Sequence, residues 1–325
     1  MESRTILVTG GLGLIGHNVV ARLEQQGHRV IITDIKTNYG MIPQEELDYL
    51  LTERRKKIKT DRIYSIDISD LDGIDWLMRT HQPDAVIHLA SFPRQKVVNA
   101  HPQWGSRTMS EGLLNLLEAA RNNHVRKFIY ISSSMVYGDF TNDATEDAEC
   151  RPQGQYGIMK LAGEWLVRDY SRRGFFDHVI IRPSAVYGEL DVEDRVISKF
   201  LLTAMRGGVL KVNGASETLD FTYVEDAADG IVAATLSPTT NNKTYNITKS
   251  HSWSLLDAAN LAVRIVGQGT VEVRDKDADF PSRGALNINA ARQDFDFDPK
   301  VDIEEGFQRY YEWLDNSVYW SKKTV

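Results

Sequence analysis

The sequence predicts an α/β protein in which a doubly wound parallel sheet, with helices on both faces, is followed by a smaller C-terminal lobe. Short β-branched runs alternate with longer amphipathic segments through residues 1–182, which is the pattern of βαβ units. A glycine-rich segment directly follows the first run and opens a helix. Beyond residue 182 the spacing loosens, because shorter elements are separated by Pro183, Gly188, Gly207, Gly208 and Gly214. We therefore expect a first domain over residues 1–182 and a second lobe mainly over residues 183–325.

The strands of the sheet are expected to be short and apolar, because a parallel strand is covered by helices on both faces. Such runs occur at residues 5–9, 29–33, 63–65, 85–88, 128–132 and 178–182. Helices are expected between them, among them residues 15–26, 112–122 and 156–170. Later runs at 218–224 and 243–247 predict strands that return to the main sheet, so the two lobes should be interleaved.

Composition excludes several classes of protein. The 325 residues include 38 basic and 45 acidic side chains, and the net charge of −7 argues against nucleic acid or an anionic membrane as the main partner. The single cysteine, Cys150, can form neither an internal disulfide nor a thiolate metal site, so we expect no metal and a cytoplasmic location. Strand-like residues begin at Thr5 without a leader, and no apolar run reaches about 18 residues. The basic run at 53–59 is typical of a solvated helix face.

The segment TILVTGGLGLIG predicts a dinucleotide site. It places Gly10, Gly13 and Gly16 between a strand and a helix, where glycine lets a pyrophosphate approach the backbone and the helix N-terminus favours its charge. Asp34 ends the next predicted strand, and a carboxylate there binds ribose hydroxyls and repels a 2′-phosphate. The cofactor is therefore predicted to be NAD, although Asp34 could instead be a simple turn residue before Ile35.

Further cofactor contacts are expected where parallel strands end, because ligands bind at the carboxyl edge of such sheets. The side chains predicted to line the cofactor there and in the first helical turn are Leu14, Ile15, Ile35, Asp67, Ile68, Leu89, Ala90, Ser91 and Ser132.

A catalytic site is predicted beside this cofactor. Tyr156 and Lys160 are four residues apart on a predicted helix, so their side chains share one face. An ammonium group near a tyrosine lowers the pKa of its phenol from about 10 and makes it a better base. Ser133 follows the strand that ends in the same crevice and can donate to a substrate oxygen. Alternatively, Tyr156 is a packed helix residue and Lys160 a surface charge.

Several stretches occur in an order that resembles the extended short-chain dehydrogenases, the NAD-dependent nucleotide-sugar epimerase/dehydratase group. They are TGGLGLIG, HLAS, NLLEAARNNHVRKFIYISSSMVYG, YGIMK, RPSAVYG, DFTYVEDAADGI and SRGALNINAARQDFDFDPKVDIEEGFQ. The resemblance covers nearly the whole chain. It implies a Rossmann-type doubly wound parallel sheet, a C-terminal substrate-binding lobe, NAD as cofactor and a nucleotide sugar as small-molecule substrate.

By this resemblance, Ser133, Tyr156 and Lys160 are the catalytic residues, and Tyr156 and Lys160 also contact the cofactor. Pro183 and Val186, with Ser91, fall where the family lines the nicotinamide end. The resemblance also implies a homodimer built on helices 112–122 and 156–170. Its candidate seam residues are Leu113, Leu117, Trp165 and Leu166.

One departure from the family narrows the reaction. Dehydratases and decarboxylases that resemble this chain usually carry an acidic residue two positions before Tyr137, where this sequence has Met135. A thioether cannot transfer protons, so dehydration is disfavoured and oxidation at C4, with or without epimerisation, is expected.

Other departures concern the substrate. Leu219 replaces the arginine that normally meets the substrate pyrophosphate, and Met109 and Ala185 replace two asparagines of the family. The missing charge would then come from other side chains. The candidate substrate-binding residues are Arg94, Ser134, Arg195, Lys199 and Arg283.

Three functions remain open from the sequence. The first is a nucleotide-sugar 4-epimerase, in which hydride leaves C4 to NAD and returns to the other face. The second is an NAD-dependent dehydrogenase that releases a 4-keto sugar or oxidises another secondary alcohol. The third, from a different class, is an NAD-binding sensor that has lost catalysis.

Overall fold

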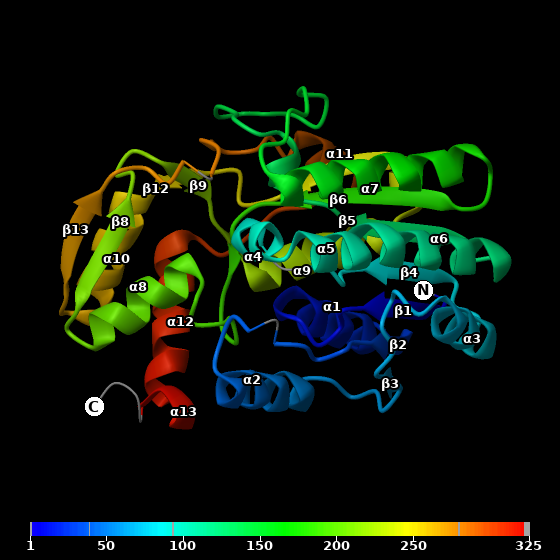
Figure 1. Cartoon of the computed structure of the whole chain (residues 1–325), viewed down its shortest axis with the longest axis horizontal. Coiled ribbons are helices and arrows are strands. Elements are labelled where there is room, and N and C mark those ends of the chain that lie inside the picture. The colour runs from blue at the N-terminus through cyan, green and yellow to red at the C-terminus, as the bar shows by residue number, and fades with distance from the viewer. Residues whose placement is uncertain (1, 39, 93, 279, 322–325) are drawn as a thin grey trace.

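A seven-stranded parallel sheet forms the centre of the computed structural model, which describes residues 2–38, 40–92, 94–278 and 280–321 (Figure 1). Its strand order is β11-β6-β5-β4-β1-β2-β3, which is a Rossmann-type doubly wound arrangement. Six of its strands are β1 (Thr5–Thr9), β2 (Arg29–Thr33), β3 (Ile63–Tyr64), β4 (Ala85–His88), β5 (Lys127–Ile131) and β6 (Asp177–Pro183). Each lies within one residue of its predicted bounds.

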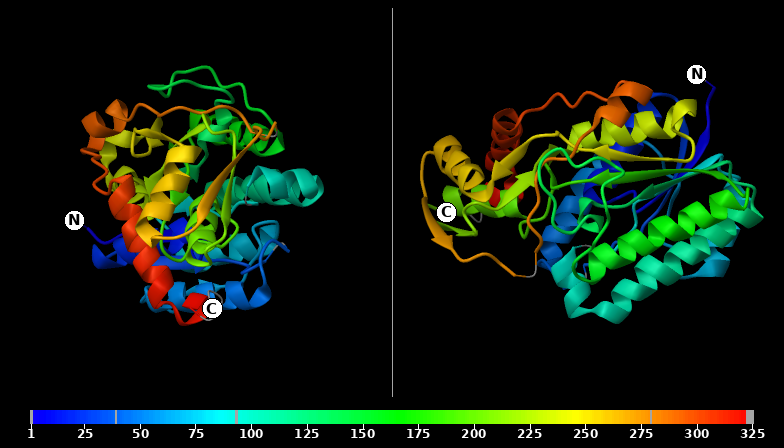
Figure 2. Two further views of the ribbon diagram at one scale, coloured as in Figure 1. Left: turned by 90° about the vertical axis from the view of Figure 1, so that its left-hand side faces the viewer. Right: turned by 90° about the horizontal axis from the view of Figure 1, so that it is seen from above.

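Helices cover both faces of this sheet (Figure 2). One face carries α3 (Leu71–His81), α6 (Gly112–Asn122) and α7 (Gln155–Arg172), and the other carries α1 (Leu14–Gln25), α9 (Val224–Leu236) and α11 (Asn289–Phe295). The remaining helical segments near the sheet are α2 (Gln44–Lys56), α4 (Gln95–Ala100), α5 (Pro102–Ser106), a π-helical turn at Arg107–Glu111 and 3-10 turns at Ser134–Val136 and Pro238–Thr240. The prediction for α6 is confirmed without change, and α1 and α7 differ from theirs by one or two residues at each end.

Alternate side chains of each strand enter two separate cores, because neighbouring residues of a strand point to opposite faces. In β1, Ile6 and Val8 pack with α1 and α9, whereas Leu7 packs with α3 and α6. Leu113 and Leu117 of α6 are fully buried in this second core. Their prediction as dimer seam residues is therefore wrong, because the apolar stripe of α6 faces its own sheet.

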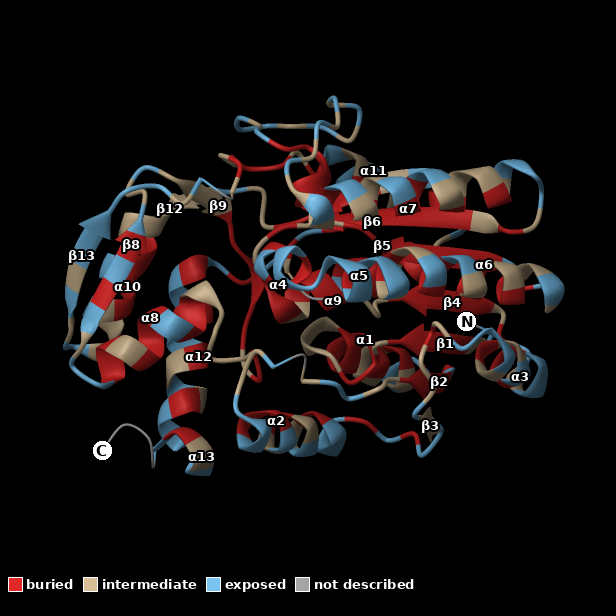
Figure 3. Ribbon diagram, viewed as in Figure 1, coloured by how far each residue is buried: buried red, intermediate tan, exposed pale blue. Residues whose placement is uncertain are grey.

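The second lobe has its own core, formed by helices that pack on a small sheet and show their exposed sides to solvent (Figure 3). Its elements are α8 (Val196–Met205), β8 (Val209–Asn213), α10 (Leu255–Val266), β13 (Thr270–Arg274), α12 (Ile303–Asn316) and α13 (Val318–Ser321). β8 and β13 pair in parallel. Among the described residues, no helix is both long and apolar enough to cross a membrane.

The structure corrects the prediction that residues 218–224 return to the main sheet. The segment divides into β9 (Thr218–Asp220), which pairs with β12 (Ser252–Ser254), and β10 (Thr222–Tyr223), which pairs with β7 (Val186–Tyr187). The carboxylate of Asp220 is buried and accepts the Leu286 N–H at 3.0 Å, which holds this segment against the chain of the second lobe.

The other predicted returning strand does join the main sheet. β11 (Lys243–Ile247) pairs in parallel with β6 and forms its edge. The sheet of the first domain therefore includes a strand, β11, that lies about 60 residues beyond the expected boundary at residue 182. We keep residue 182 as a proposed boundary, with β11 assigned to the first domain.

Candidate active site

The loop between β1 and α1 is shaped by glycine. Gly10 has a φ of +69°, and a Cβ atom there would lie 2.7 Å from the backbone nitrogen of Ala90. At Gly16 a Cβ would lie 2.2 Å from the Gly10 carbonyl oxygen, so neither position accommodates a side chain. Gly13 precedes the first turn of α1 and provides no side-chain cap. The first N–H groups of the helix are therefore available to an anion.

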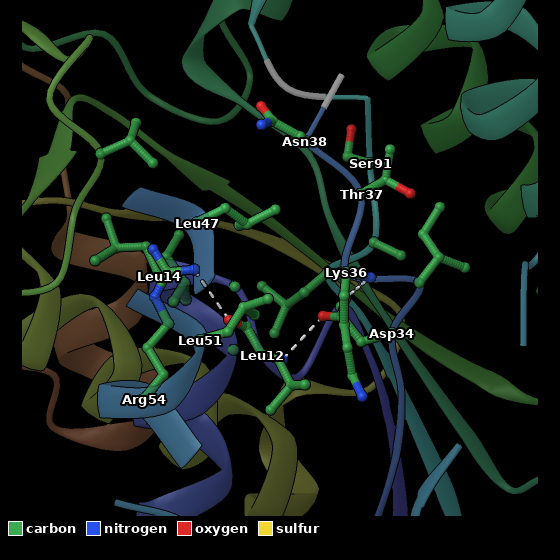
Figure 4. Close-up of a pocket in the computed structure, with 18 of the residues that line it drawn as sticks. Leu12, Leu14, Asp34, Lys36, Thr37, Asn38, Leu47, Leu51, Arg54 and Ser91 are labelled. Atoms are coloured by element: carbon green, nitrogen blue, oxygen red, sulfur yellow. Dashed lines mark hydrogen bonds between the residues drawn. The ribbon is translucent and has the colours of Figure 1, made fainter. Parts of the chain in front are cut away.

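The Asp34 carboxylate is held at the end of β2 by two backbone groups. One oxygen accepts the Leu12 N–H at 3.0 Å, and the other accepts the Lys36 N–H at 2.8 Å. Figure 4 shows Asp34 beside Leu12, at the wall of the cavity that the glycine-rich loop also lines. The carboxylate is thus fixed next to the loop, as a group that binds ribose hydroxyls must be.

The cavity above this edge of the sheet has a volume of about 370 Å³. Most residues predicted to contact the cofactor line it: Gly10, Gly13, Leu14, Ile15, Gly16, Asp34, Ile35, Asp67, Ile68, Leu89, Ala90, Ser91, Tyr156 and Val186. Three do not, namely Ser132, Lys160 and Pro183. Ser132 and Lys160 are buried beneath the cavity. Pro183 is the last residue of β6.

Tyr156, Lys160 and Ser133 lie together, as the sequence predicts. Tyr156 is in the first turn of α7 and has a hydrogen-bonding interaction with Ser133. Lys160 is buried, donates to the Ile131 carbonyl at 2.8 Å, and places its Nζ 5.8 Å from the centre of the Tyr156 ring. Desolvation lowers the pKa of Lys160 to about 7. Burial raises the pKa of Tyr156, whereas the charge of Arg195 and the bond with Ser133 oppose that rise.

The sequence analysis did not identify the buried carboxylate of Glu164, which lies beneath Tyr156, Lys160 and Ser133. Glu164, one helical turn after Lys160, accepts the Ser132 hydroxyl at 2.6 Å. The same carboxylate is bound by the Arg182 guanidinium through two bonds of 2.9 and 2.7 Å. Burial alone would raise the pKa of Glu164, but Arg182 outweighs it and holds that pKa below its ordinary value. Ser132 is therefore directed to Glu164 and not to the cofactor cavity.

Arg54 was also missed, because the run 53–59 was expected to be a solvated face. Its side chain is buried, lines the cavity, and donates to the Leu12 carbonyl at 3.1 Å and to the Leu190 carbonyl at 2.6 Å. The guanidinium thus joins the glycine-rich loop to the loop after β7. Helical spacing could have indicated the burial of Arg54, because Leu47, Leu50 and Arg54 fall on one stripe of α2, and that stripe is buried.

Two of the predicted substrate-binding residues line the same cavity as Tyr156. Arg94 forms an ion pair with Asp194 at 2.7 Å, and Arg195 approaches Asp191 at 3.8 Å. Lys199 also pairs with Asp194 and does not line the cavity.

Ser134 and Met135 do not reach the cavity either. Ser134 is buried and donates to the Ser184 hydroxyl at 3.1 Å. The Met135 side chain is only 6% exposed and is not part of the cavity wall. The position at which related dehydratases carry an acid is therefore closed by a buried thioether.

Arg283 lines a second cavity of about 260 Å³ between residues 216–218 and 282–284 of the second lobe and residues 140–142 of the first domain. Its Nε is buried and has no hydrogen-bond partner among the described residues. Desolvation and the nearby charge of Arg195 lower the pKa of Arg283 to about 10. Leu219, which replaces the family's arginine, instead packs against the core of the second lobe. An anion bound between Arg195 and Arg283 would satisfy both guanidinium groups.

Comparison with known proteins places residues 6–248 in the NAD dependent epimerase/dehydratase family. A Bacillus subtilis (strain 168) protein, the uncharacterized UDP-glucose epimerase YtcB, is 28% identical over 97% of this chain and 98% of its own length. The UDP-glucuronate 4-epimerase of Thermodesulfobacterium geofontis (strain OPF15) is 27% identical over 98% of this chain and 96% of its own. The crystal structure of UDP-glucuronic acid 4-epimerase from Bacillus cereus, with UDP-glucuronic acid and NAD, matches with a TM-score of 0.86 at 27% identity. This structural match covers 95% of this chain and 98% of the Bacillus cereus chain.

Proposed function

Because the chain belongs to the NAD dependent epimerase/dehydratase family, and is therefore an NAD-dependent enzyme of the extended short-chain dehydrogenase/reductase type, we propose that it is a nucleotide-sugar 4-epimerase. One observation carries the proposal. Tyr156, which interacts with Ser133 and lies over Lys160, lines the same cavity as the glycine-rich loop and Asp34. A sugar hydroxyl at Tyr156 would thus lie beside the reactive end of the cofactor.

The residues of the cavity fit NAD. The open backbone at Gly13 and the first turn of α1 would hold its pyrophosphate, and Asp34 its adenosine ribose. Asp67 and Ile68 would border the adenine, and Val186 with Ser91 the nicotinamide end. When bound there, NAD would supply the hydride acceptor for oxidation at C4 and the hydride donor for the reverse reduction.

The chain's own residues would then move one proton. Tyr156 takes the proton of the C4 hydroxyl as that carbon is oxidised, and gives it back when the carbon is reduced. Ser133 donates a hydrogen bond to the same sugar oxygen and orients it. Lys160 lies under the Tyr156 ring, where its positive charge favours the phenolate.

The preference for a nucleotide sugar is supported by charge on the substrate side. Arg195 lines the cavity beside Tyr156. The buried Nε of Arg283 has no hydrogen-bond partner among the described residues, and the charge of Arg195 helps to lower the pKa of Arg283. A pyrophosphate would compensate both cations, which a neutral alcohol would not. Relatives named as acting on UDP-glucose and UDP-glucuronate agree with this choice.

A dehydrogenase that releases the 4-keto sugar, or oxidises another secondary alcohol, is the second candidate, because it needs the same three catalytic side chains. Incubation of the purified protein with NAD and a panel of UDP-, GDP- and dTDP-sugars separates the two. The epimerase should give a 4-epimer without net NADH, whereas the dehydrogenase should give a 4-keto sugar with stoichiometric NADH.

The same experiment tests the consequence of Met135. Dehydration across C5 and C6 needs a proton to leave C5 and acid assistance at C6, and neither Ser134 nor Met135 offers a carboxyl group. The product should therefore keep its 6-hydroxyl. A product that has lost one water would contradict the assignment and would require an acid/base pair elsewhere in the site.

We also propose that the chain forms a homodimer through the outer side of α6 and α7, which lie side by side in Figure 2. Exposed apolar side chains gather there: Trp165 is 65% exposed, Ile158 52% and Leu114 39%. A second copy would cover them. Sedimentation at micromolar concentration should show a dimer for the wild type and a monomer for the double variant Ile158→Glu/Trp165→Glu. A wild-type monomer would refute the proposal.

A further inference from the structure

Glu164 is a carboxylate with no exposed surface and a full set of hydrogen bonds. Its Oε1 accepts from the Ser132 hydroxyl at 2.6 Å and from Arg182 Nε at 2.9 Å. Its Oε2 accepts from Arg182 Nη2 at 2.7 Å and from Arg168 at 3.1 Å. A buried acid remains ionised only when it is paired in this way, so Glu164 is a fixed negative charge inside the protein.

This carboxylate connects the elements that carry the proposed catalytic residues. Glu164 is on α7, the helix of Tyr156 and Lys160, whereas Ser132 directly precedes Ser133 at the end of β5. Ser133 begins the 3-10 turn and accepts the Met135 N–H through its hydroxyl. The bond from Ser132 to Glu164 therefore fixes the start of this turn relative to α7.

Lys160 has few charged groups around it. On its own helix it faces the Tyr156 ring and, one turn on, Glu164. From β5 it meets the Tyr130 ring at 5.3 Å and the carbonyl of Ile131. From β4 it faces His88, whose pKa is lowered to about 3 by burial and by Lys160 itself, so this imidazole is neutral. Glu164 is the one ionised acid among the groups that act on Lys160 in the described structure.

We propose that Glu164 is a positioning residue of the reaction: it locks the Ser133 turn against α7 through its bond with Ser132, and one turn along the helix from Lys160 it supplies a buried negative charge that opposes loss of the Lys160 proton. The inference rests on the roles proposed above for Ser133, Tyr156 and Lys160. Burial lowers the pKa of Lys160 to about 7, and Glu164 acts in the opposite direction. Without this charge Lys160 would lose its proton at lower pH, and the Tyr156 phenolate would lose its cation.

Two variants separate the two parts of this role. Glu164→Gln keeps the shape of the side chain and removes the charge. The alkaline limb of its kcat profile should move to lower pH by about half a unit or more. Ser132→Ala keeps the charge and removes the bond to the turn. Its kcat should fall about tenfold, with KM and the pH profile unchanged, because the loss concerns orientation alone.

Tyr137→Phe provides the matched control. The Tyr137 hydroxyl accepts from Arg182 at 2.9 Å and donates to Asn246 at 2.8 Å, on the side of Arg182 away from Glu164. This variant disturbs the same buried network and leaves both the charge and the Ser132 bond in place. It should lower kcat by no more than about twofold and leave the pH profile unmoved.

A readout without substrate keeps this inference separate from the proposed function. NMR of protein labelled at the lysine ε-carbon gives the titration of Lys160 directly, and the resonance is assigned by its loss in Lys160→Arg. The midpoint should be lower in Glu164→Gln than in wild type and unchanged in Ser132→Ala and Tyr137→Phe. Absence of 4-epimerase activity in the wild type, with this shift present, would overturn the proposed function and leave the charge role standing.

Two outcomes would overturn the inference itself. The first is a Lys160 midpoint in Glu164→Gln within about 0.2 units of the wild-type value, in protein that still binds NAD. The second outcome concerns the case in which Glu164→Gln does not fold. Such a failure is plausible physically, because the variant leaves the buried charge of Arg182 without its partner. In that case a Ser132→Ala kcat within about twofold of wild type would show that the turn does not depend on Glu164.

Discussion

The cofactor side and the substrate side of the cavity are built from different parts of the chain. On the cofactor side, glycine positions and open backbone N–H groups form the surface, and Asp34 is held by the backbone of Leu12 and Lys36. On the other side, the long side chains of Arg94 and Arg195 line the cavity, and Arg283 lines a second, separate cavity. A surface made of backbone is determined by spacing along one short segment. A surface made of side chains depends on how distant segments meet.

Charge is also arranged differently on the two sides. The carboxylate of Asp34 has both oxygens bonded to backbone groups, which fix its position at the end of β2. On the substrate side Arg94 is paired with Asp194, whereas the Nε of Arg283 has no partner in the described structure. The polar groups around Asp34 are therefore paired as they stand, whereas the proposed substrate side still has an unpaired buried donor among the described residues.

The two sides meet at Tyr156, so its replacement should have the largest effect. Tyr156→Phe removes the group that transfers the proton and leaves the cavity wall in place. Turnover should fall by roughly two to four orders of magnitude, while the dissociation constant for NAD changes less than about threefold. Activity assays with isothermal titration calorimetry give both numbers. Activity within threefold of wild type would mean that another group transfers the proton.

The substrate side should respond alone to Arg283→Met. Loss of a charge-assisted hydrogen bond to a pyrophosphate should raise KM for the nucleotide sugar by roughly tenfold to a hundredfold, with the affinity for NAD unchanged. Arg264→Met is the control, because Arg264 is an exposed arginine of the same lobe that pairs with Glu304 outside both cavities. Equal KM values for the two variants would place the substrate anion elsewhere.

The cofactor side should discriminate between dinucleotides. We expect NAD to bind at least about tenfold more tightly than NADP, because a 2′-phosphate would face the Asp34 carboxylate. Asp34→Ala should reduce the ratio of the NADP and NAD dissociation constants. Equal constants in the wild-type protein would show that Lys36, which also lines the cavity, governs the pocket instead.

Acid should destabilise the cofactor side and stabilise the substrate side. On the cofactor side, burial and the charge of Arg54 lower the pKa of His17 to about 3, below its unfolded value of about 6.5. Its contribution is complete above pH 6.5 and falls by about 1.4 kcal/mol per pH unit below that. On the substrate side, burial raises the pKa of Asp220 to about 6, so its contribution grows as pH falls from 6 to its unfolded value of about 3.8.

Hydrogen exchange at pH 7 and pH 5 tests this contrast, after correction for intrinsic rates. Peptides covering residues 5–25 should lose protection at pH 5, and peptides covering 216–224 should not. The loss should be smaller in His17→Gln. Equal loss of protection in both regions would indicate that acid acts on the fold as a whole.

The sequence predicted the cofactor side well, for a physical reason. Gly16 is required by a close contact with the Gly10 carbonyl of the same loop, and Gly10 by its positive φ as well as by a contact with Ala90 at the end of the neighbouring strand. The strands were found for a similar reason, because both faces of the sheet are covered and the runs are apolar throughout. The shared face of Tyr156 and Lys160 was predictable from their helical spacing, together with the position of their helix after the strand that ends at Ser132.

The parts that were missed all depend on contacts distant in the chain. Arg54 resembles a surface residue in its basic run, and its burial is explained by partners far along the chain, among them the Leu190 carbonyl and the carboxylate of Asp191. Glu164 resembles a solvated helix charge until Arg182 is placed opposite it. A charged side chain carries no local sign of its partner, so patterns of polarity assign it to the surface.

The position of β11 at the edge of the sheet has a consequence for how the protein is made. The glycine-rich loop after β1 is synthesised more than 200 residues before the strand that pairs with β6, which is residues 243–247. A nascent chain that has emerged only as far as β6 exposes the backbone N–H and C=O groups of that strand along its open edge. The last strand of the sheet is reached only after β7, α8, β8, β9, β10 and α9 have left the ribosome. Completion of the first domain during translation therefore waits for part of the second.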